Sequence, residues 1–287
     1  MRNASWSTVV AVQAEWKCHV LIGLTFLFFL VATTVYLHGH AIAGEEETAL
    51  QADDELEGGG AAASDPTASV NFQDIRYRYF DLEGSSHKNS FEAEGAYVFN
   101  PRLKLSHKLI GVETDVTGKS EADFSELSLK PIFLTPMKPF GINAKFAVGV
   151  EWLKDLGDFD EGTGSGTDQI APLAGIGWLP TEEDFVITLV QYFHSYDEDN
   201  GASQVNKTGP RLIYIRSLPS IKGWAKVDFK GVIDHEDGDD FTETLELQLG
   251  KMITPTVGIY GELLLGDTVF DTNAYEIGGG VALRIVY

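Results

Sequence analysis

Apolar and polar side chains alternate with a period of two along most of the chain. Segment 223–233 reads GWAKVDFKGVI. Ala225, Val227, Phe229 and Ile233 stand at odd positions, and Lys226, Asp228 and Lys230 stand at even positions. The C-terminal segment 275–287 alternates in the same way and ends on an aromatic residue. Because successive side chains of a strand point to opposite faces, this pattern predicts β-strands with one apolar and one polar face.

Two kinds of connection alternate between the predicted strands. The short ones, which often contain proline, cover residues 99–102, 135–141, 179–185, 218–223 and 253–257. The longer, polar ones cover residues 83–90, 117–123, 155–169, 195–208, 235–243 and 266–273. This arrangement predicts about twelve antiparallel strands in an up-and-down meander, with both chain ends on the side of the short turns.

Strands with two unlike faces fit a soluble sandwich or barrel with the apolar face inside, or a membrane barrel with the apolar face outside. The strands are close to the roughly 9–11 residues that cross a bilayer at a tilt. Their polar faces carry charges of both signs. Aromatic residues also fall near strand ends, as in the interface girdles of membrane barrels. These are Phe133, Trp152, Trp178, Phe185, Phe193, Trp224 and Phe241. We predict an all-β fold, a transmembrane antiparallel up-and-down β-barrel of about 12 strands, with a soluble β-sandwich as the alternative.

The chain before the predicted barrel divides into two segments. Residues 1–43 contain basic residues, then an apolar run, and end in Ala-Ile-Ala, which is the pattern of a signal peptide cleaved after Ala43. An uncleaved membrane anchor is the alternative. Residues 44–66 are acidic and rich in glycine and alanine, so we expect a disordered leader. Residues 67–287 would then form the barrel in the outer membrane of a Gram-negative bacterium, reached by export through the signal peptide.

The charge of the chain excludes one class of partner. The formal net charge of −22 argues against nucleic acid. Much of the acid lies in three long connections, where we expect an acidic outer rim made of Asp155, Asp158, Asp160, Glu161, Asp197, Glu198, Asp199, Glu236, Asp237, Asp239 and Asp240. Oxygen-rich clusters suit divalent cations, but no complete calcium-loop motif is present. A solvated rim and divalent cations at the loops therefore both stay open, and we predict no resident metal and no cofactor. As a hypothesis, the rim repels anions at the mouth.

The polar faces of the strands carry charged residues that would line the lumen. They are Arg76, Arg78, Glu92, Glu94, Lys104, Lys108, Glu126, Lys130, Lys145, Glu151, Lys226, Asp228, Lys230, Glu246, Glu262, Glu276 and Arg284. The two signs nearly balance, and long side chains of opposite charge form cross-barrel pairs. Such pairs would either fill the interior or line a polar path for a small solute, and both interpretations stay open.

Catalysis by a Ser–His pair, as in lipid-hydrolysing membrane enzymes, has no support in the sequence. The histidines after residue 43 are His87, His107, His194 and His235, and none shares a strand face with a serine two residues away. His107 falls on an apolar face. There is no G-x-S-x-G motif, metal-spaced histidine pair or phosphate loop. We predict no catalytic residue and no enzyme, and keep a lipid-modifying enzyme as the last alternative.

Several stretches in the second half of the chain resemble a known family. They are LVQYFHSYDEDN, a Leu-Pro turn, KGWAKVDFKGVIDHED, LQLGKMITPTVGIYGELLLGDT and GGGVALRIVY, and they cover roughly residues 141–287. They resemble bacterial outer-membrane transporter-like β-barrels of the MetA-pathway phenol-degradation type. The resemblance implies transport of small, hydrophobic or aromatic compounds across the outer membrane. It transfers no functional residues, and the loop at 235–240 is more acidic than the family pattern.

The last strand carries a further signal. Its apolar face, with Leu283, Ile285 and the terminal Tyr287, resembles the assembly signal of bacterial outer-membrane proteins. The expected partners are outer-membrane lipid, the barrel-assembly machinery and a small-molecule solute. Passive passage or uptake of a small solute is the leading functional prediction. A structural or surface-interaction barrel with a lumen plugged by side chains is the alternative.

Overall fold

The fold of this chain comes from a computed structural model. It describes residues 59–64, 67–82, 86–199, 201–238, 240–266, 275 and 277–287, which all belong to one compact unit, Ala52–Tyr287. The predicted signal peptide, residues 1–43, lies outside the described residues. Within the described ranges, no helix is long and apolar enough to cross a membrane.

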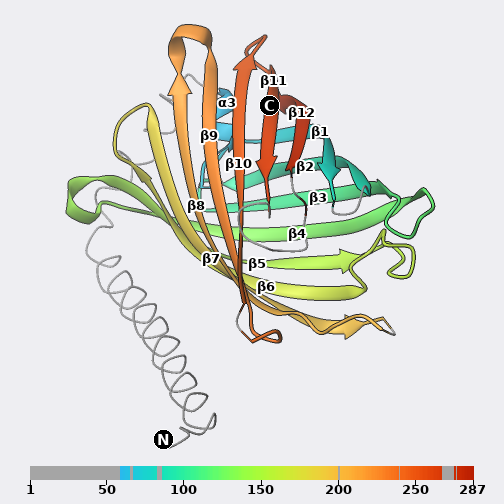
Figure 1. The fold of residues 1–287 in the computed structure, drawn as a ribbon. Coiled ribbons are helices and arrows are strands. Elements are labelled where there is room, and N and C mark those ends of the chain that lie inside the picture. Colours follow the sequence, from blue (N-terminus) through green and yellow to red (C-terminus); the bar gives the residue numbers. More distant parts are fainter. Residues whose placement is uncertain are drawn as a thin grey trace, which may run out of the picture. The chain divides into compact units, whose positions relative to one another are not determined.

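Twelve strands follow one another along this unit and close into a barrel (Figure 1). Their bounds are β1 Phe72–Asp81, β2 His87–Asn100, β3 Leu103–Thr114, β4 Glu121–Met137, β5 Asn143–Asp155, β6 Thr167–Leu179, β7 Asp184–Glu198, β8 Asn206–Leu218, β9 Gly223–Asp234, β10 Asp240–Met252, β11 Val257–Leu265 and β12 Ile277–Val286. Each strand pairs antiparallel with its neighbour in sequence, and β1 pairs with β12. The predicted all-β, up-and-down barrel of about twelve strands is therefore confirmed, and a sandwich is excluded.

Strand β12 closes the barrel against β1. Every residue of β1 has a partner on β12. Just beyond this seam, the backbone N–H of Tyr287 donates to the carbonyl oxygen of Asn71 at 3.1 Å. A closed barrel has no free sheet edge, so the chain ends on a strand without leaving an edge unpaired.

The connections follow the predicted alternation, except that the β4–β5 connection, residues 138–142, is as long as the β1–β2 and β9–β10 connections, residues 82–86 and 235–239. The short ones join β2 to β3, β4 to β5, β6 to β7, β8 to β9 and β10 to β11, and two of them contain single 3-10 turns, η2 (Pro139–Gly141) and η3 (Pro219–Ile221). The longer ones join the remaining neighbours in sequence. Because consecutive strands run in opposite directions, all short connections lie at one end of the barrel, together with the start of β1 and the end of β12.

The period-two alternation sorts side chains between the outside and the inside of the barrel. On β9, Val227 and Phe229 are exposed on the outer face, whereas Asp228 between them is fully buried. On β12, Leu283 and Ile285 are exposed in the same way. The apolar faces thus point outward and the polar faces inward.

Four of the aromatic residues predicted near strand ends are exposed, namely Phe133, Trp152, Trp178 and Phe241. The prediction is wrong for the other three. Phe185 and Trp224 are buried inside the barrel, and Phe193 lines its cavity. The reason is strand parity. Trp224 is two residues from the inward-facing Lys226, and both phenylalanines are an even number of residues from the inward-facing Gln191.

A short helix, α3 (Gly59–Ser64), lies inside the barrel and contacts β8, β9, β10 and β12. Ala61 packs in a buried apolar cluster on the inner wall with Phe185, Ile187, Ile213, Ile215, Trp224, Met252, Tyr260 and Ala282. This departs from the disordered leader that we expected over 44–66, although the rest of that segment lies outside the described residues. Ala61 and Ala63 are small enough to bury against the wall, which the overall composition of the segment does not reveal.

Candidate functional site

Charged side chains on the inner face of β1 start a network of ion pairs. Asp74, Arg76 and Arg78 share this face because they are two residues apart on one strand. Arg76 lies 3.1 Å from Glu92 on β2 and 3.1 Å from Glu262 on β11. Arg78 also reaches Glu262, at 2.6 Å. The two arginines therefore tie together strands on both sides of β1.

Glu246 on β10 forms ion pairs with three cations of the network. Its oxygens lie 2.6 Å from Lys226, 3.1 Å from Lys230 and 3.2 Å from Arg78. Three cations from β1 and β9 thus surround one buried carboxylate. This arrangement offsets the cost of removing the carboxylate from water.

Asp228 on β9 is held in a similar way. The Nε of Arg211 on β8 donates to it at 2.7 Å, and the Nη2 of the same guanidinium contacts its second oxygen. Lys226 adds a contact at 3.3 Å. A two-pronged arginine–carboxylate contact fixes both side chains against the wall of the barrel.

Further ion pairs cover the wall formed by β3, β4 and β5. Lys108 lies 2.8 Å from Glu126, and Lys130 lies 2.7 Å from Glu151. The side-chain amide of Gln191 on β7 donates to Glu151 at 2.6 Å. This group links β7 to the same network.

Toward the end with the short turns, Asp74 and Arg284 form a buried pair with contacts of 2.9 and 2.6 Å. The hydroxyl of Tyr260 donates to Asp74 at 2.7 Å. Arg284 Nη1 donates to the Ser64 hydroxyl of α3 at 2.5 Å, and its guanidinium carbon lies 5.0 Å from the ring centre of Trp224. Arg284 therefore joins the charged network, the inner aromatic cluster and the helix inside the barrel.

These side chains enclose a cavity of about 470 Å³. The predicted lumen residues that line it are Arg76, Arg78, Glu92, Glu94, Lys104, Lys108, Glu126, Lys130, Glu151, Lys226, Lys230, Glu246 and Arg284. Asp228 and Glu262 are buried in ion pairs with lining residues. Lys145 is half-buried and does not line this cavity. Glu276 lies outside the described residues.

Several polar residues of the network were not predicted. They are Asp74, Gln191, Arg211 and Gln248. Asp74 had a signal, because it is two residues before Arg76 on the same strand. Arg211 was harder to find because the next two inward residues of its strand, Ile213 and Ile215, are apolar.

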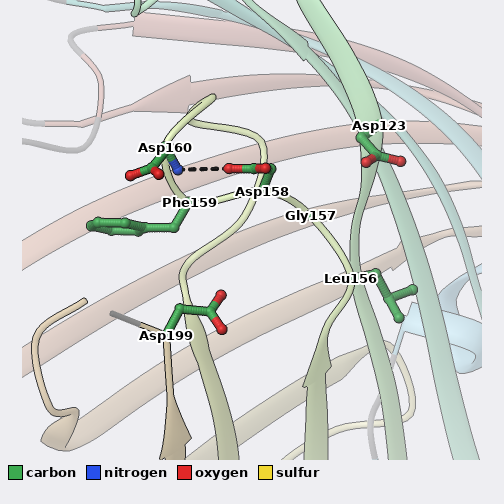
Figure 2. A pocket seen from close by; sticks show the side chains of 7 residues that line it. All are labelled: Asp123, Leu156, Gly157, Asp158, Phe159, Asp160 and Asp199. Carbon is green, nitrogen blue, oxygen red and sulfur yellow. Dashed lines mark hydrogen bonds between the residues drawn. The ribbon is translucent and has the colours of Figure 1, made fainter. Parts of the chain in front are cut away.

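The end with the long connections carries part of the predicted acidic rim (Figure 2). Asp123, Leu156, Gly157, Asp158, Phe159, Asp160 and Asp199 surround a hollow there of about 470 Å³. Figure 2 shows the carboxylate of Asp158 accepting the backbone N–H of Asp160, at 2.8 Å. At least this rim carboxylate therefore also stabilises its own loop.

Other rim carboxylates also accept hydrogen bonds within the loops, as Asp155 does from the backbone N–H of Gly166 and Glu236 from the side-chain amide of Asn206. Repulsion from Glu121 raises the pKa of the exposed Glu161 carboxyl. Asp155, Asp197, Glu198, Glu236 and Asp237 are described in or beside the long connections, Asp239 lies outside the described residues, and nothing is described of the Asp240 side chain. Within the described ranges, no three acidic or histidine side chains come close enough together to hold a metal ion. Divalent cations at the loops stay a prediction.

Two histidines have partners that bear on the enzyme alternative. His107 Nε2 lies 2.9 Å from Gln73 Oε1, and both belong to outward-facing positions that flank Gly95 on the intervening strand. His87 Nδ1 lies 2.9 Å from Asp115. Neither histidine meets a serine, so these positions do not form the Ser–His pair that lipid hydrolysis would need.

Comparison with known proteins gives a fold but no family. No known family profile and no curated protein matches the chain. The KdgM porin is 9% identical, with a TM-score of 0.51 over 75% of this chain and 99% of the porin. The NanC porin is 10% identical, with a TM-score of 0.53 over 75% and 98%. The COG4313 outer membrane channel from Pseudomonas putida F1 is 11% identical, with a TM-score of 0.58 over 76% and 96%.

The chain has the fold of twelve-stranded outer-membrane channels. At these identities the likeness is one of fold alone. The resemblance to barrels of the MetA-pathway phenol-degradation type stays a prediction.

Proposed function

We propose that this protein is an outer-membrane channel through which small solutes pass passively along the lumen. The observation that carries the proposal is the cavity of about 470 Å³ inside a closed barrel, lined by charged side chains. The outer face supports a membrane location, because Tyr77, Phe91, Leu249 and Val281 are all exposed there. A barrel with an apolar outside and a charged inside is the arrangement of outer-membrane channels.

The partners that follow are outer-membrane lipid around the apolar face, the assembly machinery acting on the last strand, and a small solute in the lumen. The resemblance to transporter-like barrels adds hydrophobic or aromatic compounds as candidate solutes. The inner cluster around Trp224 and Phe185 is buried, with α3 packed on it, and it would offer apolar surface to such compounds once α3 is removed. Liposome swelling with small aromatic solutes, with and without residues 59–64, tests this finer proposal.

The experiment that tests channel function is single-channel recording of the refolded protein in a planar bilayer. We expect discrete conductance steps, because the lumen already holds water-sized space between its ion pairs. Refolding is verified by the heat-modifiable shift on electrophoresis, and detergent without protein is the control. Absence of any conductance from folded protein over a range of voltages and salts would contradict the proposal.

A structural barrel with a plugged lumen is the second candidate. Pairs such as Arg78 with Glu246 join strands three places apart in the barrel, and α3 takes up inner space. Deleting residues 59–64 separates the two readings. A channel that α3 narrows gains conductance in the deletion variant. A barrel plugged by the ion-paired side chains of its own wall shows no conductance in either form.

A further inference from the structure

The carboxylates inside the barrel are mostly hidden from the cavity. The side chains of Asp74, Glu92, Glu151, Asp228, Glu246 and Glu262 are between 0 and 7% exposed. Among the carboxylates that line the cavity in the described part of the chain, only Glu94 and Glu126, at 38% and 27%, keep substantial contact with solvent. Most of the negative charge therefore lies close to the wall, behind other side chains.

Several inner cations are also largely hidden, namely Arg76, Arg78, Lys104, Lys226 and Arg284, but four others are not. Lys108 and Lys130 are 29% and 24% exposed on β3 and β4, and Arg211 and Lys230 are 32% and 35% exposed on β8 and β9. All four line the cavity. Long basic side chains extend past the shorter acids that they pair with, so their charged ends come closest to the solvent. The surface that a solute meets is thus more positive than the total charge of the lumen.

The exposed cations also face one another across the lumen. In the closed order of twelve strands, β3, which carries Lys108, lies opposite β9, which carries Lys230, and β2 lies opposite β8. Glu94 on β2 and Arg211 on β8 line the same cavity, although their strands are six places apart in the barrel. A solute in this space is within reach of ammonium and guanidinium donors from both walls.

We propose that the lumen selects small anions, and that small carboxylates are its preferred class of solute. This inference rests on the proposed channel function. Guanidinium and ammonium groups donate hydrogen bonds to a carboxylate, and a low-dielectric wall strengthens their field. The acidic rim repels anions at the mouth. The inner cations therefore determine that anions are preferred over cations, and the rim lowers the rate at which anions enter.

The test is the reversal potential of the refolded protein under a gradient of potassium chloride and then of potassium acetate. We expect chloride and acetate to permeate better than potassium. Lys230→Gln removes one positive charge from the channel wall, and the salt solution partly screens that charge. The ratio of anion to cation permeability should therefore fall by about twofold. Glu94→Gln should raise the ratio by a similar factor. Lys251→Gln is the matched control, because Lys251 stands on the outward-facing register of β10, and should leave the ratio unchanged.

The outcomes separate the two proposals. Folded protein without conductance overturns channel function, and anion selection with it. Conductance with a cation preference overturns anion selection and leaves channel function standing. An anion preference that neither Lys230→Gln nor Glu94→Gln alters would also overturn the assignment to these inner side chains. If a variant refolds poorly, Lys230→Cys in a Cys18→Ser background, treated with a negatively charged thiol reagent, gives the same test on folded protein, and should reverse the preference.

Discussion

Glu246→Gln removes one buried charge and keeps the shape of the side chain. Its carboxylate contacts Lys226, Lys230 and Arg78 at 2.6 to 3.2 Å. Lys226 retains Asp228 and Arg78 retains Glu262, whereas Lys230 has no second carboxylate within ion-pair distance in the described network. Breaking a buried pair by removing one partner costs about 3–5 kcal/mol. Because two of the three cations retain partners, we expect a loss of about 3 kcal/mol in the free energy of unfolding.

Urea unfolding of the barrel in lipid vesicles, followed by tryptophan fluorescence, measures this loss. Glu243→Gln is the matched control, since it makes the same chemical change on the same strand at an outward-facing position. The double variant Glu246→Gln/Lys230→Gln should recover about 1 kcal/mol, because it removes the cation left without its carboxylate. Equal stability of the two single variants would refute the view that the inner ion pairs hold the barrel together.

Three further predictions concern other parts of the barrel. Deletion of Tyr287 should reduce the membrane yield of heat-modifiable protein in cells, because the terminal aromatic is proposed as the assembly signal; a normal yield would count against that proposal. Gly250→Ala should lower the free energy of unfolding by about 1–3 kcal/mol, because its added methyl would stand 2.2 Å from the Trp224 indole, and urea unfolding checks this. The backbone N–H of His87, at 2.7 Å, lowers the pKa of Asp115. The contact should therefore stabilise the loop at pH values above the ordinary pKa of the carboxyl and be lost as pH falls through the lowered value. NMR titration should show this loss in the wild type and not in Asp115→Asn.

Much of the fold could be predicted because the side chains of a strand alternate between its two faces with a period of two residues. The alternation around Lys226 and Asp228 determines which residues face inward, and the lengths of the connections give the number of strands. The closing pair of β1 and β12 also follows, since an up-and-down meander with an even strand number brings its ends together.

The details of the interior were harder to predict. Alternation shows that Trp224 and Lys226 share the inward face. Tryptophan is common at membrane–water interfaces, and this tendency gave the wrong prediction that Trp224 lies on the outer face. The pairing of Arg78 with Glu246 depends on the curvature of the barrel, which no local pattern contains. The burial of Ala61 depends on an apolar area of the wall that forms only when β8, β9 and β10 are side by side.

The ion pairs also bear on the order in which the barrel forms. Asp74 and Arg284 are separated by 210 positions in the chain, and Arg78 and Glu246 by 168. Contacts between such distant residues have a high entropic cost until the intervening chain is in place. The free energy of these pairs is therefore released almost entirely when β1 meets β12. An unclosed sheet would carry unpaired charges along its inner face. The pairing of β1 with β12 is therefore the step that makes the barrel stable. Partly assembled forms in which these strands are still unpaired should be short-lived.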